Sequence, residues 1–107
     1  MTDKRVVLIT AGTKDEAAKI ARVLVERRLA ACVNVVGPME SVYRWKGTIE
    51  SAQEWLLVVK TMAKAVDEIS ARVQELHSYE LPECLVLPVE GGSEEYLEWI
   101  GENVEIG

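Results

Sequence analysis

The 107-residue sequence predicts one α+β domain, residues 1–107, in which helices lie on one face of an antiparallel sheet. Three observations support this fold class. Apolar segments with the two-residue period of strands alternate with segments that have the three-to-four-residue period of helices. Residues 41–60 have the pattern of a long β-hairpin that turns at Lys46-Gly47. No proline-, glycine- or serine-rich linker divides the chain, which is too short for a second core.

The first half of the chain predicts a strand, a helix and a second strand. Residues 5–11, RVVLITA, form a nearly continuous apolar run that is typical of a central strand. Thr13 and Glu16 have the spacing of a capping box and begin an amphipathic helix. Residues 30–36 predict the next strand, which leads into the hairpin through Gly37-Pro38, where we expect a bulge to bend it.

The second half predicts a helix, a strand and a helix. Thr61 is expected to cap a helix that ends near His77. An irregular segment, HSYELPE, then leads to a short strand from Cys84, and a last helix begins at Ser93. Two right-handed crossovers joined by a hairpin make a ferredoxin-like sandwich, βαββαβ plus a C-terminal helix, with the second and fourth strands at opposite sheet edges.

The hairpin is long for a subunit of this size. Its arms, expected at residues 31–45 and 48–60, would each extend over roughly 40 Å. A globule of this length has a radius of gyration of only about 13 Å. We therefore expect the bulge to bend the hairpin and another copy of the chain to cover its apolar far end.

The acidic composition argues against polyanionic partners. The net charge is -6 at pH 7, whereas nucleic acids and anionic membranes attract basic surfaces. The apolar run near the amino terminus, Val6 to Ile9, is far shorter than the roughly 20 residues of a membrane span. We expect a cytoplasmic protein that binds neither nucleic acid nor membrane and keeps its two cysteines reduced.

Several segments together resemble one protein family: AACVNVV, SVYRWKGTIE, QEWLLVVKT, HSYELPE and EYLEWI. They are similar to the CutA divalent-cation tolerance family over nearly the whole chain. The resemblance implies a homotrimer, similar in architecture to the PII signal-transduction proteins, that binds a divalent metal, with copper as the expected ion. Two positions that hold copper ligands in some bacterial relatives are Ile9 and Leu76 here, and Ser78 replaces the proline of the family's His-Pro-Tyr-Glu tetrad.

The candidate metal ligands are His77, the only histidine, and Cys32, in the second strand. Imidazole and thiolate both bind transition metals, although no CxxC or HxxxH spacing is present. An isolated histidine at a helix end is also typical of a hydrogen-bonding group, and a cysteine in an apolar strand is typical of a buried, inert thiol. Both alternatives stay open for each residue.

The resemblance also implies a cleft between neighbouring subunits, whose candidate residues are Tyr43, Trp45, Glu54, Lys60, Tyr79 and Glu83. A small ligand there would meet a cation from Lys60 or Arg44, aromatic rings for stacking, and the Glu54 carboxylate for an amine. The alternative is an interface network in which Glu54 and Lys60 neutralise each other and the aromatic residues are packing anchors.

Catalysis has little support, because the chain contains no P-loop, GxGxxG motif or nucleophile elbow. We expect a protein that is not an enzyme. Three functions remain: a trimer that binds divalent metal in cation tolerance, a PII-like sensor that binds a small metabolite in its clefts, and a purely structural scaffold.

Overall fold

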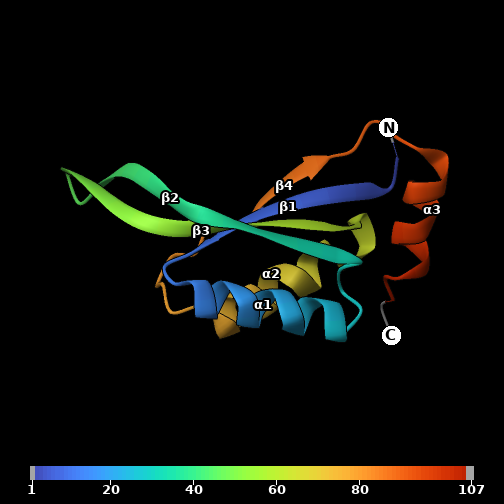
Figure 1. Ribbon diagram of the computed structural model, residues 1–107, viewed down its shortest axis with the longest axis horizontal. Coiled ribbons are helices and arrows are strands. Elements are labelled where there is room, and N and C mark those ends of the chain that lie inside the picture. Colours follow the sequence, from blue (N-terminus) through green and yellow to red (C-terminus); the bar gives the residue numbers. More distant parts are fainter. Residues whose placement is uncertain (1, 106–107) are drawn as a thin grey trace.

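A computed structural model describes residues 2–105 as an antiparallel sheet with three helices (Figure 1). The elements in chain order are β1 (Lys4–Ala11), α1 (Lys14–Glu26), β2 (Cys32–Trp45), β3 (Thr48–Met62), a short 3-10 helix (Ala63–Ala65), α2 (Val66–Leu76), β4 (Leu85–Pro88) and α3 (Glu94–Glu102). The strand order is β2-β3-β1-β4, and all neighbours are antiparallel. The predicted ferredoxin-like fold is therefore confirmed, with β2 and β4 at opposite edges.

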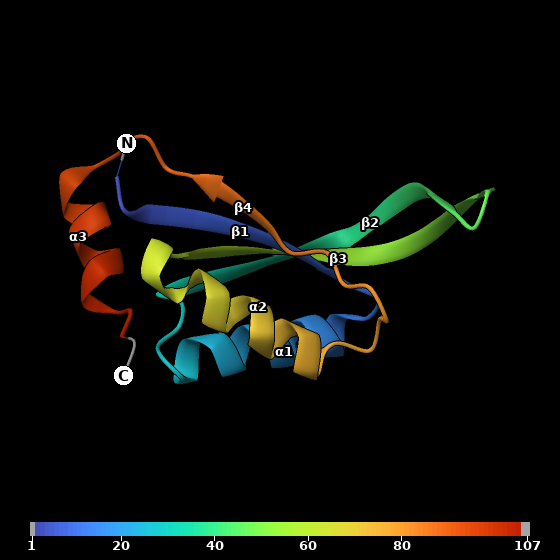
Figure 2. The same cartoon turned by 180° about the vertical axis from the view of Figure 1, so that it is seen from behind.

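The core lies between the sheet and helices α1 and α2, which cover the same face of the sheet (Figures 1 and 2). Val7 and Ile9 of β1 and Leu57 and Val59 of β3 are fully buried, because every second residue of a strand points to the same face. The helices complete this core with residues at the spacing of an amphipathic helix. These are Ala17, Ile20 and Leu24 of α1 and Ile69 and Val73 of α2.

The two predicted helix caps have different outcomes. Thr13 caps α1 as predicted, since its Oγ1 accepts a hydrogen bond from the Glu16 amide at 3.1 Å. Thr61 does not cap α2, because β3 extends through it and its buried hydroxyl donates to the Leu29 carbonyl at 2.6 Å. A buried carbonyl needs a donor, and the 3-10 helix then connects the strand to α2, whose N-cap Ala65 makes no side-chain bond.

The long hairpin turns at the predicted residues. Lys46 and Gly47 both have positive φ, 50° and 80°, as a two-residue type I′ turn requires. β1 pairs with β3 only from Trp55 onward, so the part of the hairpin between Met39 and Glu54 has no third strand beside it. This part, the projecting arm, extends away from both helices (Figure 1). It raises the radius of gyration to 14.3 Å, against about 13 Å for a globule of this length.

The predicted bulge lies where the hairpin leaves the rest of the sheet. The pairing register shifts between Val36 and Met39, around the cis Gly37-Pro38 peptide. Gly37 lies against Trp55, and a Cβ added there would lie 2.5 Å from the indole Cδ1. Only glycine therefore fits at this bend without displacing the tryptophan.

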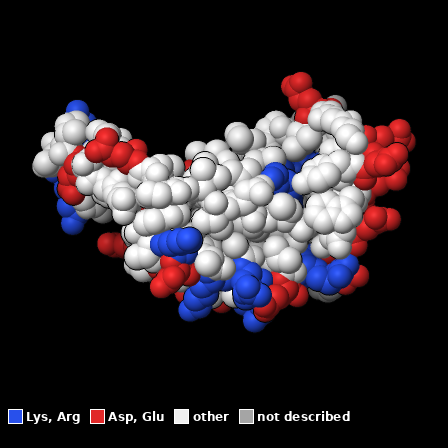
Figure 3. All heavy atoms as spheres, viewed as in Figure 1, with Lys and Arg blue, Asp and Glu red and all other residues white. Residues whose placement is uncertain are grey.

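Large apolar side chains remain exposed on the hairpin and on the β4 edge. Their exposed fractions range from 44% to 66% for Val36, Val42, Ile49, Leu85 and Leu87. Figure 3 shows few charged groups on the middle of one face, between the charged hairpin tip and the acidic surface of α3. Exposed apolar surface of this kind is typical of a contact region for another molecule.

Among residues 2–105, no helix is long and apolar enough to cross a membrane.

Candidate functional site

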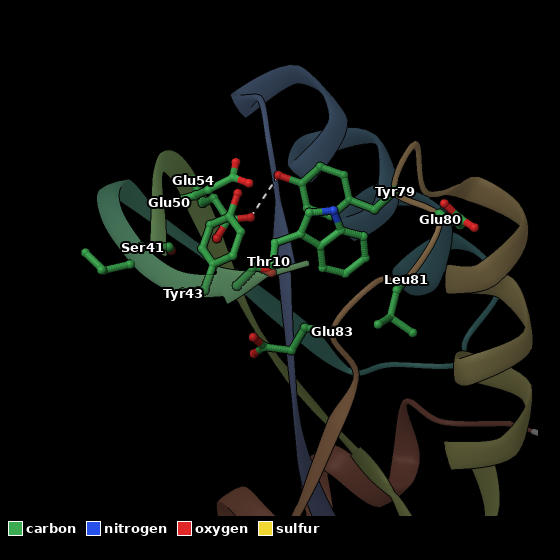
Figure 4. Close-up of a pocket in the computed structure, with 11 residues that line it drawn as sticks. Thr10, Ser41, Tyr43, Glu50, Glu54, Tyr79, Glu80, Leu81 and Glu83 are labelled. Atoms are coloured by element: carbon green, nitrogen blue, oxygen red, sulfur yellow. Dashed lines mark hydrogen bonds between the residues drawn. The ribbon is translucent and has the colours of Figure 1, made fainter. Parts of the chain in front are cut away.

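A cavity of about 650 Å³ lies where the projecting arm meets the segment that follows α2. The hairpin contributes Ser41, Val42, Tyr43, Trp45, Glu50 and Glu54, and β1 contributes Thr10. The segment after α2 contributes Tyr79, Glu80, Leu81 and Glu83. Figure 4 shows the labelled hairpin residues and those of this segment on different sides of the cavity. Its size is within the roughly 300–1,000 Å³ of small-molecule sites.

Strand alternation determines which hairpin side chains face the cavity. Tyr43 lies opposite Glu50 in the register, and directly opposed residues point to the same face. Trp45 lies two residues from Tyr43 on β2, and Glu54 lies four residues from Glu50 on β3. Both side chains therefore share the face of this pair. Arg44 points to the other face and does not line the cavity.

Lys60 lies outside the cavity within one chain. It is six residues from Glu54 along β3, a distance of about 20 Å. Its ammonium group donates to Asn34 Oδ1 on the neighbouring strand. Lys60 therefore does not neutralise Glu54 within one chain, and a pairing of the two across a subunit interface stays a prediction.

Tyr79 joins the segment after α2 to the hairpin. Its hydroxyl donates to Glu54 Oε2 at 2.8 Å (Figure 4). Glu54 is only 8% exposed, and a buried carboxylate requires such a donor. Burial and this bond raise the pKa of Tyr79 to about 12, so the phenol stays protonated at neutral pH. Gly12 makes room for the ring, because a Cβ there would lie 2.8 Å from the hydroxyl oxygen.

The cavity is acidic. Four carboxylates line it, those of Glu50, Glu54, Glu80 and Glu83. Burial, together with the negative charge of Glu54, raises the pKa of Glu83. No lysine or arginine lines the cavity in the part of the chain that the structure describes. A site lined by one sign of charge concentrates ions of the other sign, so the cavity favours cations.

His77 uses both ring nitrogens in hydrogen bonds within the protein. Its Nδ1 accepts from the Tyr79 amide at 3.0 Å, and its Nε2 lies 2.5 Å from the Thr10 carbonyl oxygen. Only the neutral ring with its proton on Nε2 satisfies both contacts. The imidazole is buried, and in this state it fixes the start of the segment that carries Tyr79.

Glu16 was not predicted to lie near His77. Its buried Oε1 is 3.5 Å from His77 Nδ1 and has no hydrogen-bond partner among residues 2–105. Because that nitrogen carries no proton, the two groups do not form an ion pair. The capping-box spacing assigned this carboxylate to the helix N-terminus, and no local signal connects it with a residue so distant in sequence.

The two predicted metal ligands are not brought together. Cys32 lies opposite Lys60, whereas Thr10, the partner of His77, lies opposite Leu56. These positions are about 13 Å apart along β3. Across residues 2–105, no three histidine, cysteine, aspartate or glutamate side chains lie close enough to hold one metal ion. His77 and Cys32 therefore do not form a copper site within one chain.

Comparison with known proteins shows the family. The family model described as "CutA1 divalent ion tolerance protein" matches residues 5–103. The chain belongs to the CutA1 family. The divalent-cation tolerance protein CutA of Thermus thermophilus is 48% identical over 100 residues, which are 94% of this chain and 97% of the relative. That of Archaeoglobus fulgidus is 42% identical over 99 residues, which are 92% and 96% of the two chains.

Solved CutA structures have the same fold. The structure of the Thermus thermophilus protein has a TM-score of 0.94 and 47% identity, and the match covers 95% of this chain and 99% of that chain. A plant CutA from Arabidopsis thaliana is named chloroplastic, and this chain spans 52% of its length. The Archaeoglobus fulgidus structure is described as that of a periplasmic protein. The compartment therefore varies among CutA relatives.

Proposed function

We propose that the protein is a non-enzymatic, cytoplasmic homotrimer that acts in divalent-cation tolerance and binds its cation in the acidic cavity. The observation that carries this proposal is a cavity lined by four carboxylates and by no lysine or arginine among the described residues. The family's name supports a role in tolerance of divalent ions. A cavity with this charge attracts cations before any specific contact forms.

Assembly is supported by the exposed apolar residues of the hairpin. Val42 and Ile49 are 66% and 59% exposed in one chain, and apolar residues are typical of the buried centre of homo-oligomeric interfaces. Sedimentation equilibrium is expected to give three times the mass of the chain. Val42→Asp combined with Ile49→Asp is expected to shift the protein towards monomer, and a folded, dilute wild-type monomer would contradict the proposal.

Copper does not fit the two predicted ligands, because His77 has no free ring nitrogen and Cys32 lies elsewhere along the sheet. Carboxylates suit hard cations such as Mg²⁺, Ca²⁺ and Mn²⁺. Mg²⁺ often binds through one or two carboxylates, with water completing its coordination. We assign the metal to Glu54 and Glu83, because both line the cavity from opposite segments and Glu54 is largely buried.

Calorimetric titration tests this assignment. Mn²⁺ and Cu²⁺ would be titrated into the wild type, Glu83→Gln, Cys32→Ser and Glu98→Gln. The last variant removes the same charge from an exposed position on α3. Mn²⁺ is expected to bind Glu83→Gln more weakly and the other two variants as tightly as the wild type. Loss of binding in Cys32→Ser alone would contradict the assignment, and equal millimolar affinity in all four proteins would exclude a dedicated site.

A second candidate is a PII-like sensor, and the same cavity favours it because its volume is far larger than one metal ion needs. In that case an organic ligand would fill the cavity and the trimer would pass the signal to a protein partner. A thermal-shift screen tests it, since a ligand at 100 times its dissociation constant adds about 2.7 kcal/mol to the native state. The scaffold function would be favoured if neither metal nor organic ligand bound.

A further inference from the structure

We propose that the acidic cavity binds an aliphatic polyamine, a flexible chain of methylene groups with two or more ammonium groups. The inference rests on the proposed function in one respect, that the cavity is the cation site, and it adds the chemical class of an organic ligand. It is carried by the spread of the carboxylates, the aromatic and apolar lining, and the state of Glu54.

The four carboxylates are too widely spread for a single ion to contact them all. Glu50 and Glu54 come from β3, and Glu80 and Glu83 come from the segment after α2 (Figure 4). Glu50 and Glu54 are four residues apart on one strand, or about 13 Å. Among the described residues, no three such side chains converge on one point. A chain with separated ammonium groups meets several of these carboxylates at once, which one metal ion cannot do.

The remaining lining suits methylene and ammonium groups. Tyr43 and Trp45 are 41% and 40% exposed, so part of each side chain is open to a ligand. Aromatic faces attract ammonium groups, and the Lys46 ammonium already lies 5.9 Å from the Trp45 ring centroid at the turn. Leu81 adds apolar surface for a methylene chain. A strongly hydrated metal ion gains little from such surfaces, because it gives up its water reluctantly.

Glu54 retains capacity to accept a hydrogen bond. Within residues 2–105 its carboxylate accepts one hydrogen bond, from the Tyr79 hydroxyl to Oε2. An ionised carboxylate has about four lone-pair sites, so one bond from a phenol leaves room for an ammonium donor. Because Glu54 is largely buried, a charged partner there would gain more than it would at the surface.

Calorimetric titration of the assembled protein with simple amines tests the proposal. Butylamine, putrescine and spermidine would be compared in buffer containing EDTA, with 1,4-butanediol as the neutral analogue and succinate as the anionic one. Affinity is expected to rise from butylamine to spermidine, while the diol and succinate do not bind. Binding of succinate in place of the amines would overturn the proposal, because it would require a cationic site. Equal binding of the diol would overturn it as well.

Matched variants locate the binding. Glu54→Gln keeps an oxygen acceptor for Tyr79, and Glu83 is not one of the buried core residues. Each substitution by glutamine is expected to weaken spermidine binding roughly tenfold to hundredfold, the loss of one charge-assisted hydrogen bond. Glu98→Gln is expected to leave the affinity unchanged. Equal weakening in all three variants would overturn the proposal, because it would show attraction to the net charge alone.

The two proposals fail in different ways. If Mn²⁺ binds through Glu83 and no amine binds, the cavity is a metal site and the polyamine inference is wrong. If neither Mn²⁺ nor any amine binds, the cavity is not a cation site and both proposals are wrong. Competition between spermidine and Mn²⁺ that disappears in Glu83→Gln would support both.

Discussion

The two halves of the hairpin have the same strand pattern but different surroundings. In the half beside β1, Leu57 and Val59 are fully buried beneath the helices. In the projecting arm, Val42 and Ile49 lie on the strand face opposite to that of Tyr43 and are more than half exposed. The alternation of side chains is therefore the same, and only the cover differs. The first half stabilises the fold of the chain, whereas the second leaves apolar surface exposed.

The largest expected effect comes from β1, the strand that pairs with the buried half of the hairpin. Ile9→Ala should lower the free energy of unfolding by about 2–5 kcal/mol, because Ile9 is fully buried between β1 and the helices. Ile49→Ala removes the same atoms from the projecting arm, where the side chain is 59% exposed in one chain. It should mainly raise the dissociation constant of the proposed trimer.

Urea unfolding and sedimentation at several protein concentrations separate these effects. Ile9→Ala should lower the unfolding midpoint by the same amount at every concentration, and Ile49→Ala should act most at low concentration. If both variants lost stability equally and independently of concentration, the projecting arm would belong to the subunit core.

The next effect lies at the boundary between the halves. Gly37→Ala should destabilise the protein by about 1–3 kcal/mol, because the new methyl group would lie 2.5 Å from the Trp55 ring. The matched control is Gly91→Ala, where no atom lies within 4 Å of the added Cβ. Thermal unfolding measures both, and a stable Gly37→Ala protein would show that the bulge adapts to a side chain.

The hairpin was predictable because its signals are local. Alternation, the turn at Lys46-Gly47 and the break at Gly37-Pro38 predict the hairpin, its bend and the fold that contains it. The prediction that Thr61 caps a helix was wrong, because a threonine before a helix is equally suited to the end of a strand. Its hydroxyl is needed by the carbonyl of Leu29, a residue distant in sequence.

The site was only partly predictable. Five of the six candidate cleft residues line one cavity, and whether it lies between subunits stays a prediction. Lys60 does not line the cavity, because it lies six residues from Glu54 along β3. Strand alternation predicts which face a side chain is on, but not which side chains on that face lie close together. The same alternation would have found Glu50, which shares a face with Glu54. Glu80 had no such signal, because tertiary packing alone brings its segment to the hairpin.

A smaller effect concerns the contact that joins the two regions. Tyr79→Phe removes the only donor that the described residues supply to the buried Glu54 carboxylate, and should cost about 1–3 kcal/mol. Tyr43→Phe removes a hydroxyl from a half-exposed ring in the same cavity and should change stability little. Urea unfolding compares them, and equal stability of the two variants would show that water replaces the Tyr79 hydroxyl.

The smallest effect is the pH dependence of Glu83. Burial and the charge of Glu54 raise its folded-state pKa above the ordinary value of 4.5. The folded protein therefore holds this proton more tightly than the unfolded chain does. The resulting stability is fully present below pH 4.5 and is lost as pH rises through the folded-state pKa.

Glu83→Gln should therefore melt at a higher temperature than the wild type at neutral pH, and the gap should close in acid. Glu98→Gln, an exposed control on α3, should show no such convergence. A gap that is constant with pH would mean that Glu83 is as well solvated as a surface residue. Because a bound cation favours the ionised carboxylate, spermidine should stabilise the wild type more than Glu83→Gln and narrow the gap at neutral pH. Such a result would show that Glu83 destabilises the folded protein at neutral pH mainly when no cation is bound in the cavity. The covered half of the hairpin would be unaffected by the ligand.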